Sequence, residues 1–535
     1  MDLTMPANHE LTGRRQLVSA RKRLLMASLL FAFLFPYTTW EQAAWCVLLL
    51  MILDSLILPW LDIDISKTPG AAGEHSPNAA LFLGERVASV ASRVRGYLLR
   101  PVYLIRPHAV VDLSPSPHRL VEARAAVHPL PLGEGEDRVR ATTSERTGII
   151  LYAISALALV VLYRRDLHIA AAAWAIMALG DGMAAVIGEG LASSWRGKLA
   201  AAVPWNPEKT WAGSLSFAIA GTAGAYVFTR WTANQIAPSS AFAVCAAGAL
   251  LGAAIESFPL ALDDNVTVPL IVGAFMFCAF LMERSALDSN LPYLGRRILL
   301  AIGVNSVFAL SAWALKAASR SGAVCGFLLG TAIYLGYGYK SFLLLFAFVL
   351  LGSVTTRLGF AKKEARGVAE RRGGARSWRE ALANLLAPSF FAILVITTHH
   401  EAAFLIALVA ALAEAAGDTV SSEIGQWASD RAYLLTTFKS VRAGEDGGVS
   451  MAGTAAGFSA SAAIVGLGLG LGLCGPYRFA GPGIALGAAV LGNLLDSLLG
   501  ATLQQRGLVT NGMVNFAGTS VAGGLALGLA LHLGL

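Results

Sequence analysis

The chain has 535 residues, of which 56% are hydrophobic and 14% charged, and its formal net charge is +7. Together with a mean hydropathy of +0.61, these values exclude an ordinary soluble protein and indicate a polytopic helical membrane protein. The cations cluster between apolar runs, as the positive-inside bias requires, so the net charge does not indicate a nucleic-acid partner. Five cysteines lie in apolar runs without ligand spacing, which argues against disulfides and zinc.

The apolar runs predict about fifteen transmembrane helices, at roughly 20 residues per crossing. The first two are expected at 24–40 and 43–61. A polar segment follows at 62–146, which we interpret as a largely disordered insertion; an amphipathic surface helix within it and a flexible tether are equally good alternatives. Further spans are expected near 148–163, 167–179, 213–230, 240–257, 266–282, 295–315, 321–338, 341–359, 384–397, 401–416, 450–474, 481–500 and 513–534.

Three polar blocks interrupt the earlier spans: LGDGMAAVIG, WNPEKTWAGS and ESFPLALDDNVTVPL. Asp181 ends an apolar run, and Lys209 stands in a proline-bounded turn before a helix start rich in small residues. Glu256 and Asp264 flank a short break between spans. Each alone is explained by capping, topology or a solvated turn. We interpret Lys209 as a phosphate contact, and Glu256 and Asp264 as groups for a second metal or for activating a hydroxyl. A Mg²⁺–nucleotide role for Asp181 is implied by the family resemblance given below.

A denser polar stretch follows in the later half, from Gly417 to Thr454. Glu414 and Asp418 are four residues apart and share a face of a continuing helix, close to serine hydroxyls. Such oxygen ligands suit Mg²⁺. Lys439 and Arg442 supply cations, and the glycines at 444, 447, 448 and 453 allow close backbone approach to phosphate, with a helix expected to begin near Ser450. Asp496, with apolar residues on both sides, also requires a functional explanation.

The polar blocks occur twice in the same order. Asp181 pairs with Asp418, Gly213 with Gly453 and Glu256 with Asp496, at offsets of 237, 240 and 240 residues. This agreement predicts two homologous repeats in one all-α membrane protein. If the basic amino terminus is cytoplasmic, counting crossings also puts the basic segment 361–379, which we interpret as topology-determining, and both sets of acids on the cytoplasmic side. Arg284, Arg296 and Arg297 fall outside, against the rule.

The first copy resembles the polyprenol kinase superfamily, which includes dolichol kinase, plant phytol kinase and, more distantly, phosphatidate cytidylyltransferase. The matching positions are Gly180-Asp181-Gly182, Gly188, Asn206-Pro207, Lys209-Thr210, Ala212-Gly213-Ser214, Glu256-Ser257 and Asp263-Asp264-Asn265. The second copy resembles the integral-membrane family that includes plant phytyl-phosphate kinases, through GDTVSSEIG, TTFKSVRAGEDGGVSMAGT, GNLLDSLLGATLQ and TNGMVNF.

The resemblance implies a prenol kinase-like domain at 1–290 and a prenyl-phosphate kinase-like domain at 291–535, in the cell membrane with both sites facing the cytoplasm. They would convert an isoprenoid alcohol to its monophosphate and then its diphosphate, with CTP or another NTP as donor and Mg²⁺ as cofactor. The expected catalytic residues are Asp181, Lys209, Glu256, Asp264, Asp418, Glu423, Lys439 and Asp496. The expected donor-binding residues are Asn206, Lys209, Thr210, Gly213, Lys439, Gly447, Gly448, Ser450 and Gly453. The expected metal ligands are Asp181, Asp264, Asp418 and Glu423.

Two alternatives remain open. A cytidylyltransferase making a CDP-lipid also fits WNPEKTWAGS, but it would release pyrophosphate rather than a nucleoside diphosphate. A transporter built from membrane repeats would hold its substrate on polar residues near the bilayer midplane, whereas most acids here stand at helix ends.

Overall fold

The apolar runs fold into helices joined by short polar segments. The computed structural model describes residues 29–49, 148, 150–192, 201–476 and 479–535. The predicted insertion at 62–146 lies outside the described residues, as do parts of the first two predicted spans, 24–28 and 50–61. Within the described ranges, ten helices are long and apolar enough to cross a membrane, and two shorter apolar helices accompany them. This confirms the predicted class of all-α polytopic membrane protein.

In the earlier half, small residues let the helices pack closely. A Cβ added at Gly180 would lie 2.8 Å from the ring of Phe217, and one at Gly224 would collide with the side chain of Leu179. The continuous helical rod formed by residues 167–192 therefore lies directly against the helix that starts at Trp211. The elements are η1 (Leu29–Tyr37), Ile150–Leu162, α5 (Leu167–Ala175), η3 (Ile176–Asp181), α6 (Gly182–Ala192), β1 (Ala202–Val203), β2 (Asn206–Thr210), α7 (Trp211–Thr232), α8 (Pro238–Ser257) and α9 (Asp264–Phe280).

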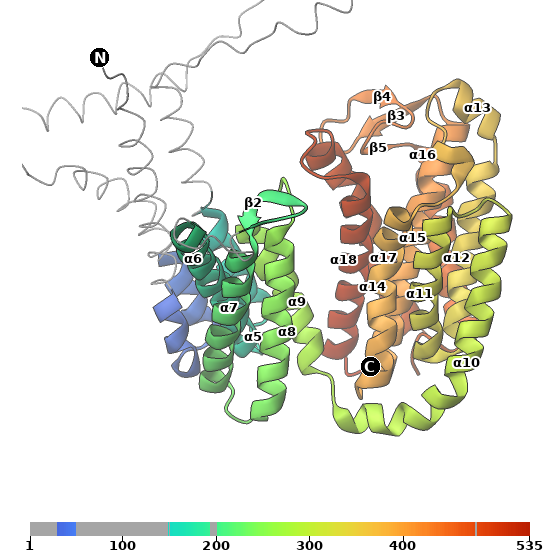
Figure 1. Cartoon of the computed structure of the whole chain (residues 1–535). Helices are drawn as coiled ribbons and strands as arrows, with labels where there is room; N and C mark the ends of the chain where they lie inside the picture. Colours follow the sequence, from blue (N-terminus) through green and yellow to red (C-terminus); the bar gives the residue numbers. More distant parts are fainter. Residues whose placement is uncertain (1–28, 50–147, 149, 193–200, 477–478) are drawn as a thin grey trace, which may run out of the picture. The chain divides into compact units, whose positions relative to one another are not determined.

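Helix α10 (Arg284–Ala314) is longer than the span predicted at 295–315. It has 31 residues, contains Pro292 and bends along its course (Figure 1). Arg284, Arg296 and Arg297, which the count of crossings places outside against the positive-inside rule, all lie in the earlier part of this helix. A crossing needs roughly 20 residues, so these turns do not have to lie in the apolar layer.

The later half is organised around α15 (Glu401–Ala428). Its most apolar stretch is 94% buried, and it packs against α12, α14, α16, α17 and α18. Phe404, Leu405 and Leu412 are among its core side chains. The elements are α11 (Arg320–Tyr337), α12 (Tyr339–Arg357), α13 (Phe360–Ala365), η5 (Arg371–Gly374), α14 (Trp378–Thr397), β3 (Arg431–Leu434), β4 (Ser440–Arg442), β5 (Gly448–Val449), α16 (Met451–Gly470), α17 (Ala480–Leu499), η6 (Gly500–Gln504) and α18 (Asn511–His532).

The three short strands form an antiparallel sheet in the order β4-β3-β5. Figure 1 shows this sheet at one end of the later helices, on the same end as α13. The polar stretch identified in the sequence thus divides between the last turns of α15 and the sheet, and β5 leads directly into α16.

A buried ion pair fastens α13 to α15. Lys363 Nζ lies 2.6 Å from Glu423 Oε2, and the two side chains are 0% and 4% exposed. Nζ also donates to the carbonyl oxygens of Thr355 and Thr356, and the Thr356 hydroxyl donates to Glu423 Oε1. All three ammonium protons and both carboxylate oxygens therefore have partners. Although the sequence predicts a topology-determining segment at 361–379, Lys363 within it has this structural role instead.

Replacing Lys363 with Met is expected to lower the free energy of unfolding by about 3–5 kcal/mol, because it leaves a buried carboxylate uncompensated. Lys362→Met is the matched control: the neighbouring lysine is exposed and donates only to the Trp427 carbonyl oxygen, so its loss should cost about 1 kcal/mol or less. Unfolding of the detergent-solubilised protein measures both, and equal losses would contradict the structural role assigned to the pair.

Candidate functional site

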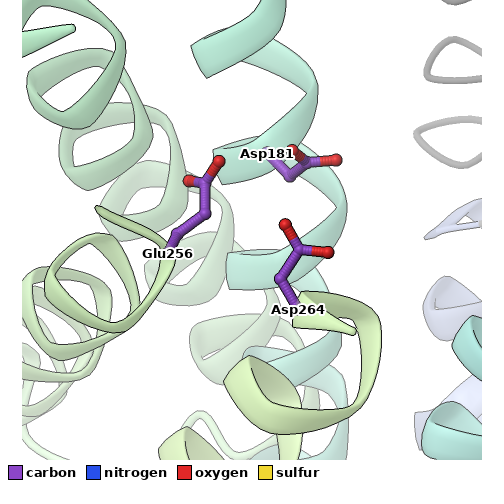
Figure 2. Close-up of side chains that lie close together, drawn as sticks. All are labelled: Asp181, Glu256 and Asp264. Atoms are coloured by element: carbon purple, nitrogen blue, oxygen red, sulfur yellow. The ribbon is translucent and has the colours of Figure 1, made fainter. Parts of the chain in front are cut away.

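Three carboxylates from three elements meet in the earlier half. Asp181 ends η3, Glu256 lies in the last turn of α8, and Asp264 begins α9. Each offers an oxygen atom within 4.8 Å of the others, and Figure 2 shows the three side chains converging. Asp181 and Glu256 are buried while Asp264 is partly exposed, so the cluster is reached from the Asp264 side. The sequence prediction that these acids act together is consistent with this arrangement.

A widened helical turn precedes Asp181. Residues Ile176–Asp181 form a π-helix between the α-helical segments α5 and α6. Such turns insert one extra residue into the helix and are frequent at functional sites. Because the extra residue rotates the turns that follow it, the widened turn sets the direction in which Asp181 leaves the helix.

Lys209 contributes a positive charge to this cluster. Strand β2 places its Nζ 2.5 Å from Glu256 Oε1 and 3.9 Å from Asp264 Oδ2. Burial lowers the pKa of Lys209, but attraction to Glu256, the hydrogen bond to it, and the charges of Asp264 and Asp181 together raise it more, so the net pKa lies above the ordinary value. The ammonium group therefore stays charged throughout the neutral range.

A hydroxyl cap joins β2 to α7. Thr210 Oγ1 accepts a hydrogen bond of 3.1 Å from the Gly213 backbone N–H, which satisfies one free donor of the helix. Gly188 of α6 packs on this cap, since a Cβ there would lie 3.5 Å from Thr210 Oγ1. Asn206 is buried, and its Oδ1 accepts from the Glu208 backbone N–H at 3.1 Å. Asn206, Thr210 and Gly213 thus shape the strand–helix junction beside Lys209.

The donor set of the cluster fits a hard divalent cation. Asp181, Glu256 and Asp264 present oxygen atoms only, and Mg²⁺ prefers oxygen ligands while keeping waters for substrate phosphates. The three carboxylates converge, and like charges at this distance disfavour one another, so a divalent cation would stabilise the cluster. The residues therefore fit a magnesium ion.

The later half contains a polar cavity of about 390 Å³. Its walls come from the later part of α15, from the loop that precedes α16, from helices α17 and α18, and from the segment that precedes α14. Its polar lining includes Asp418, Asp496, Asn493, Asn515, Ser450 and Arg376. The cavity thus gathers acids, amides and one arginine from segments far apart in the sequence.

Asp418 and Asp496 both line this cavity. Asn515 Nδ2 donates to Asp418 Oδ2 at 3.4 Å, while Asp496 Oδ2 is buried without a hydrogen-bond partner. Two carboxylates in one cavity disfavour each other's negative charge, and a proton or a cation relieves that repulsion. The unpartnered oxygen and the second acid therefore fit a metal ion here as well.

The structure separates the other acids of this half from that pair. Glu423 lines the cavity, but both of its oxygens are engaged by Thr356 and Lys363. Glu414 is buried beside Gly492 and Gly518 and is not part of the cavity lining. The expectation that Glu423 is a metal ligand thus stays a prediction for which the structure offers no open oxygen.

The cation of the later cavity is also different from the one expected. Lys439 is exposed on the turn between β3 and β4, away from the residues that line the cavity. Arg376 lines the cavity instead. Sequence reasoning missed Arg376 because it stands among six other lysines and arginines at 361–379, and no spacing or motif distinguishes it from them.

The loop before α16 repeats the junction before α7. Ser450 Oγ accepts a 3.1 Å hydrogen bond from the Gly453 backbone N–H, as Thr210 does from Gly213. A Cβ at Gly425 would lie 3.0 Å from Ser450 Oγ and 3.7 Å from Gly453 Cα, and Gly188 stands in the same relation to Thr210 and Gly213. Both sites therefore share a strand, a hydroxyl cap and a glycine packed on that cap. Gly447, Gly448 and Ser450 line the cavity.

These features define a multi-pass helical membrane protein whose carboxylates gather beside capped helix starts. More particularly, the chain belongs to the integral membrane protein DUF92 family, whose model matches residues 303–527. It is 35% identical over 227 residues to an uncharacterized membrane protein of Methanocaldococcus jannaschii, covering 42% of this chain and 92% of that protein.

Two plant proteins are also similar. The chain is 37% identical over 192 residues to Protein VTE6, chloroplastic, of Arabidopsis thaliana, covering 35% of this chain and 57% of that protein. It is 29% identical over 146 residues to Phytol kinase 1, chloroplastic, of the same plant, covering 24% of this chain and 43% of that protein. No solved structure matches the chain. The matches confirm a relationship to phytol kinase-like membrane proteins.

Metal binding at the first cluster can be tested with Mn²⁺, a paramagnetic substitute for Mg²⁺. In an Asp418→Asn background, Asp264→Asn should weaken Mn²⁺ binding at least about tenfold, because one of three ligand oxygens loses its charge. Asp263→Asn is the matched control, since it removes the same charge one residue away and keeps an oxygen to cap α9 at the Asn265 N–H. Spin-resonance titration gives both affinities, and equal weakening would contradict the assigned ligands.

Gly447 holds the later loop against η6. Its φ is +71°, and an added Cβ would collide with the backbone of Ala501. Gly447→Ala should therefore cost about 1–3 kcal/mol more in unfolding than Gly507→Ala. Gly507 has a φ of +70° but open space around it, so it isolates the backbone strain. Thermal unfolding compares them, and equal costs would show that the close approach is unimportant.

Proposed function

We propose that this protein is a bifunctional isoprenoid kinase. The domain at 1–290 phosphorylates an isoprenoid alcohol such as phytol, geranylgeraniol or a polyprenol, and the domain at 291–535 phosphorylates the resulting monophosphate. CTP or another nucleoside triphosphate is the donor, and both sites face the cytoplasm. The observation that carries the proposal is the shared junction: in each half a hydroxyl-capped helix start stands in a site that contains converging carboxylates. Similarity to a protein named as a phytol kinase supports the substrate class.

In the first reaction, the alcohol oxygen attacks the γ-phosphorus of the donor. A new O–P bond forms, the bond from that phosphorus to the bridging β–γ oxygen breaks, and the nucleoside diphosphate leaves with the electron pair. The hydroxyl proton passes to a carboxylate oxygen of the cluster. Asp181, Glu256 and Asp264 would hold Mg²⁺, which neutralises phosphate charge when bound, and Lys209 contributes a second positive charge.

In the second reaction, an oxygen of the lipid monophosphate attacks the γ-phosphorus of another donor. The same P–O bond breaks and a second nucleoside diphosphate leaves. The attacking oxygen is already deprotonated, so no base is needed. Asp418 and Asp496 would hold the metal, and Arg376, which lines the same cavity, would bind a phosphate. Catalysis in both sites is then mainly positioning and charge neutralisation.

Purified protein given a prenol, CTP and Mg²⁺ should form the monophosphate and then the diphosphate, releasing CDP. Asp181→Asn should slow the first step about 100-fold or more and leave conversion of added monophosphate intact. Asp418→Asn should do the reverse, so that monophosphate accumulates. Asp263→Asn serves as the charge-matched control.

Loss of both steps in either single variant would contradict the division of labour. Release of pyrophosphate with formation of a CDP-lipid would instead identify a cytidylyltransferase. Absence of any substrate-dependent nucleotide turnover, with binding or movement of lipid retained, would favour the transporter alternative.

A further inference from the structure

A second cavity, of about 100 Å³, lies among α10, α11, α12 and α14. Its walls are mainly apolar and include Phe308, Ala312, Gly326, Leu345, Phe348 and Leu385; its polar lining residues are Ser353, Arg376, Glu380, Asn384 and Thr419. The space stays open because α10 and α11 present mostly glycine and alanine to the cavity, and these side chains are too small to fill it. Water gains few hydrogen bonds in such a space, which favours an apolar occupant.

This apolar cavity meets the polar cavity at two shared residues. Arg376 and Thr419 line both. An amide pair runs across the same boundary: Asn384, which lines the apolar cavity, accepts from Asn515, which lines the polar one and also donates to Asp418. A molecule occupying both cavities would thus have an apolar part beside α11 and an anionic part beside Arg376 and the Asp418–Asp496 pair.

We propose that the apolar cavity binds the first isoprene units of a prenyl monophosphate, with the phosphate at Arg376. The proposal rests on the proposed function and names the substrate-binding groove of its second step. A guanidinium group suits a phosphate because it offers several donors in a planar fork. A nucleotide fits less well, since an apolar wall cannot satisfy the hydroxyl and ring nitrogen groups of its nucleoside.

Gly326 permits a test that fills the groove without disturbing the fold. It lines the apolar cavity, and a Cβ added there would meet no atom within 4 Å. Gly326→Leu should raise the KM for a prenyl monophosphate at least about tenfold and leave methyl phosphate, which has no isoprene unit, nearly unchanged. Gly303→Leu is the matched control, because Gly303 on α10 is equally open and lies outside the cavity lining. Arg376→Gln should raise the KM of both substrates alike.

A binding measurement separates this inference from the proposed function. A prenyl monophosphate with a diazirine on its first isoprene unit should label α11 of the wild type, and Gly326→Leu should reduce that labelling. Labelling at α11 without any phosphorylation would overturn the kinase proposal and keep the groove. Normal phosphorylation with equal KM values for Gly326→Leu and Gly303→Leu would overturn the groove. Equal displacement of the probe by a diacyl phospholipid would also overturn it, by showing a general lipid site.

Discussion

The structure depends on how carboxylates are compensated among apolar helices. An ionised acid away from water needs a cation or several hydrogen bonds, and one left unpaired costs several kcal/mol, on the order of a domain's whole stability. Glu423 has a complete set of partners in Lys363 and Thr356, and it fastens one element to another. Asp496 has a buried oxygen without a partner. Buried carboxylates in the later half thus have different roles: Glu423 is structural, and Asp496 lines the polar cavity with an open oxygen.

Close helix packing decides where these acids meet. At Gly180 the rod that carries Asp181 lies directly against Phe217 of α7, and at Gly447 the loop before α16 touches the backbone of Ala501. Any larger residue would push these segments apart. Asp181, Glu256, Asp264 and Asp496 stand at or near helix ends, and Asp418 stands inside α15, so helix packing brings the acids together without a long loop. The two-stranded sheet β1-β2 precedes the capped start of α7, and the three-stranded sheet β4-β3-β5 precedes the capped start of α16.

The sequence predicts the membrane class, most helix positions and the acids of both sites, because apolar length and costly charge are local signals. Asp181, Glu256 and Asp264 come together in the structure as their order suggests. The choice of cation in the later half could not be predicted. Lys439 lies in the polar stretch and Arg376 in a basic loop, yet only a tertiary contact decides that Arg376 lines the cavity. The same holds for Lys363, whose burial depends on how α13 folds back onto α15.

The two sites differ in one respect that the proposed reactions explain. In the first, Lys209 immediately precedes the capping Thr210; at the corresponding place before Ser450 stands Val449, and the cation comes from Arg376 on another segment. An alcohol acceptor is neutral, so a point charge for the donor is enough. A monophosphate acceptor brings its own negative charges, and a guanidinium fork at the mouth of an apolar cavity matches its geometry. In the proposed reactions, a cation away from the cap would leave the second site a place for the acceptor phosphate as well as the donor, which a lysine beside the cap would not provide.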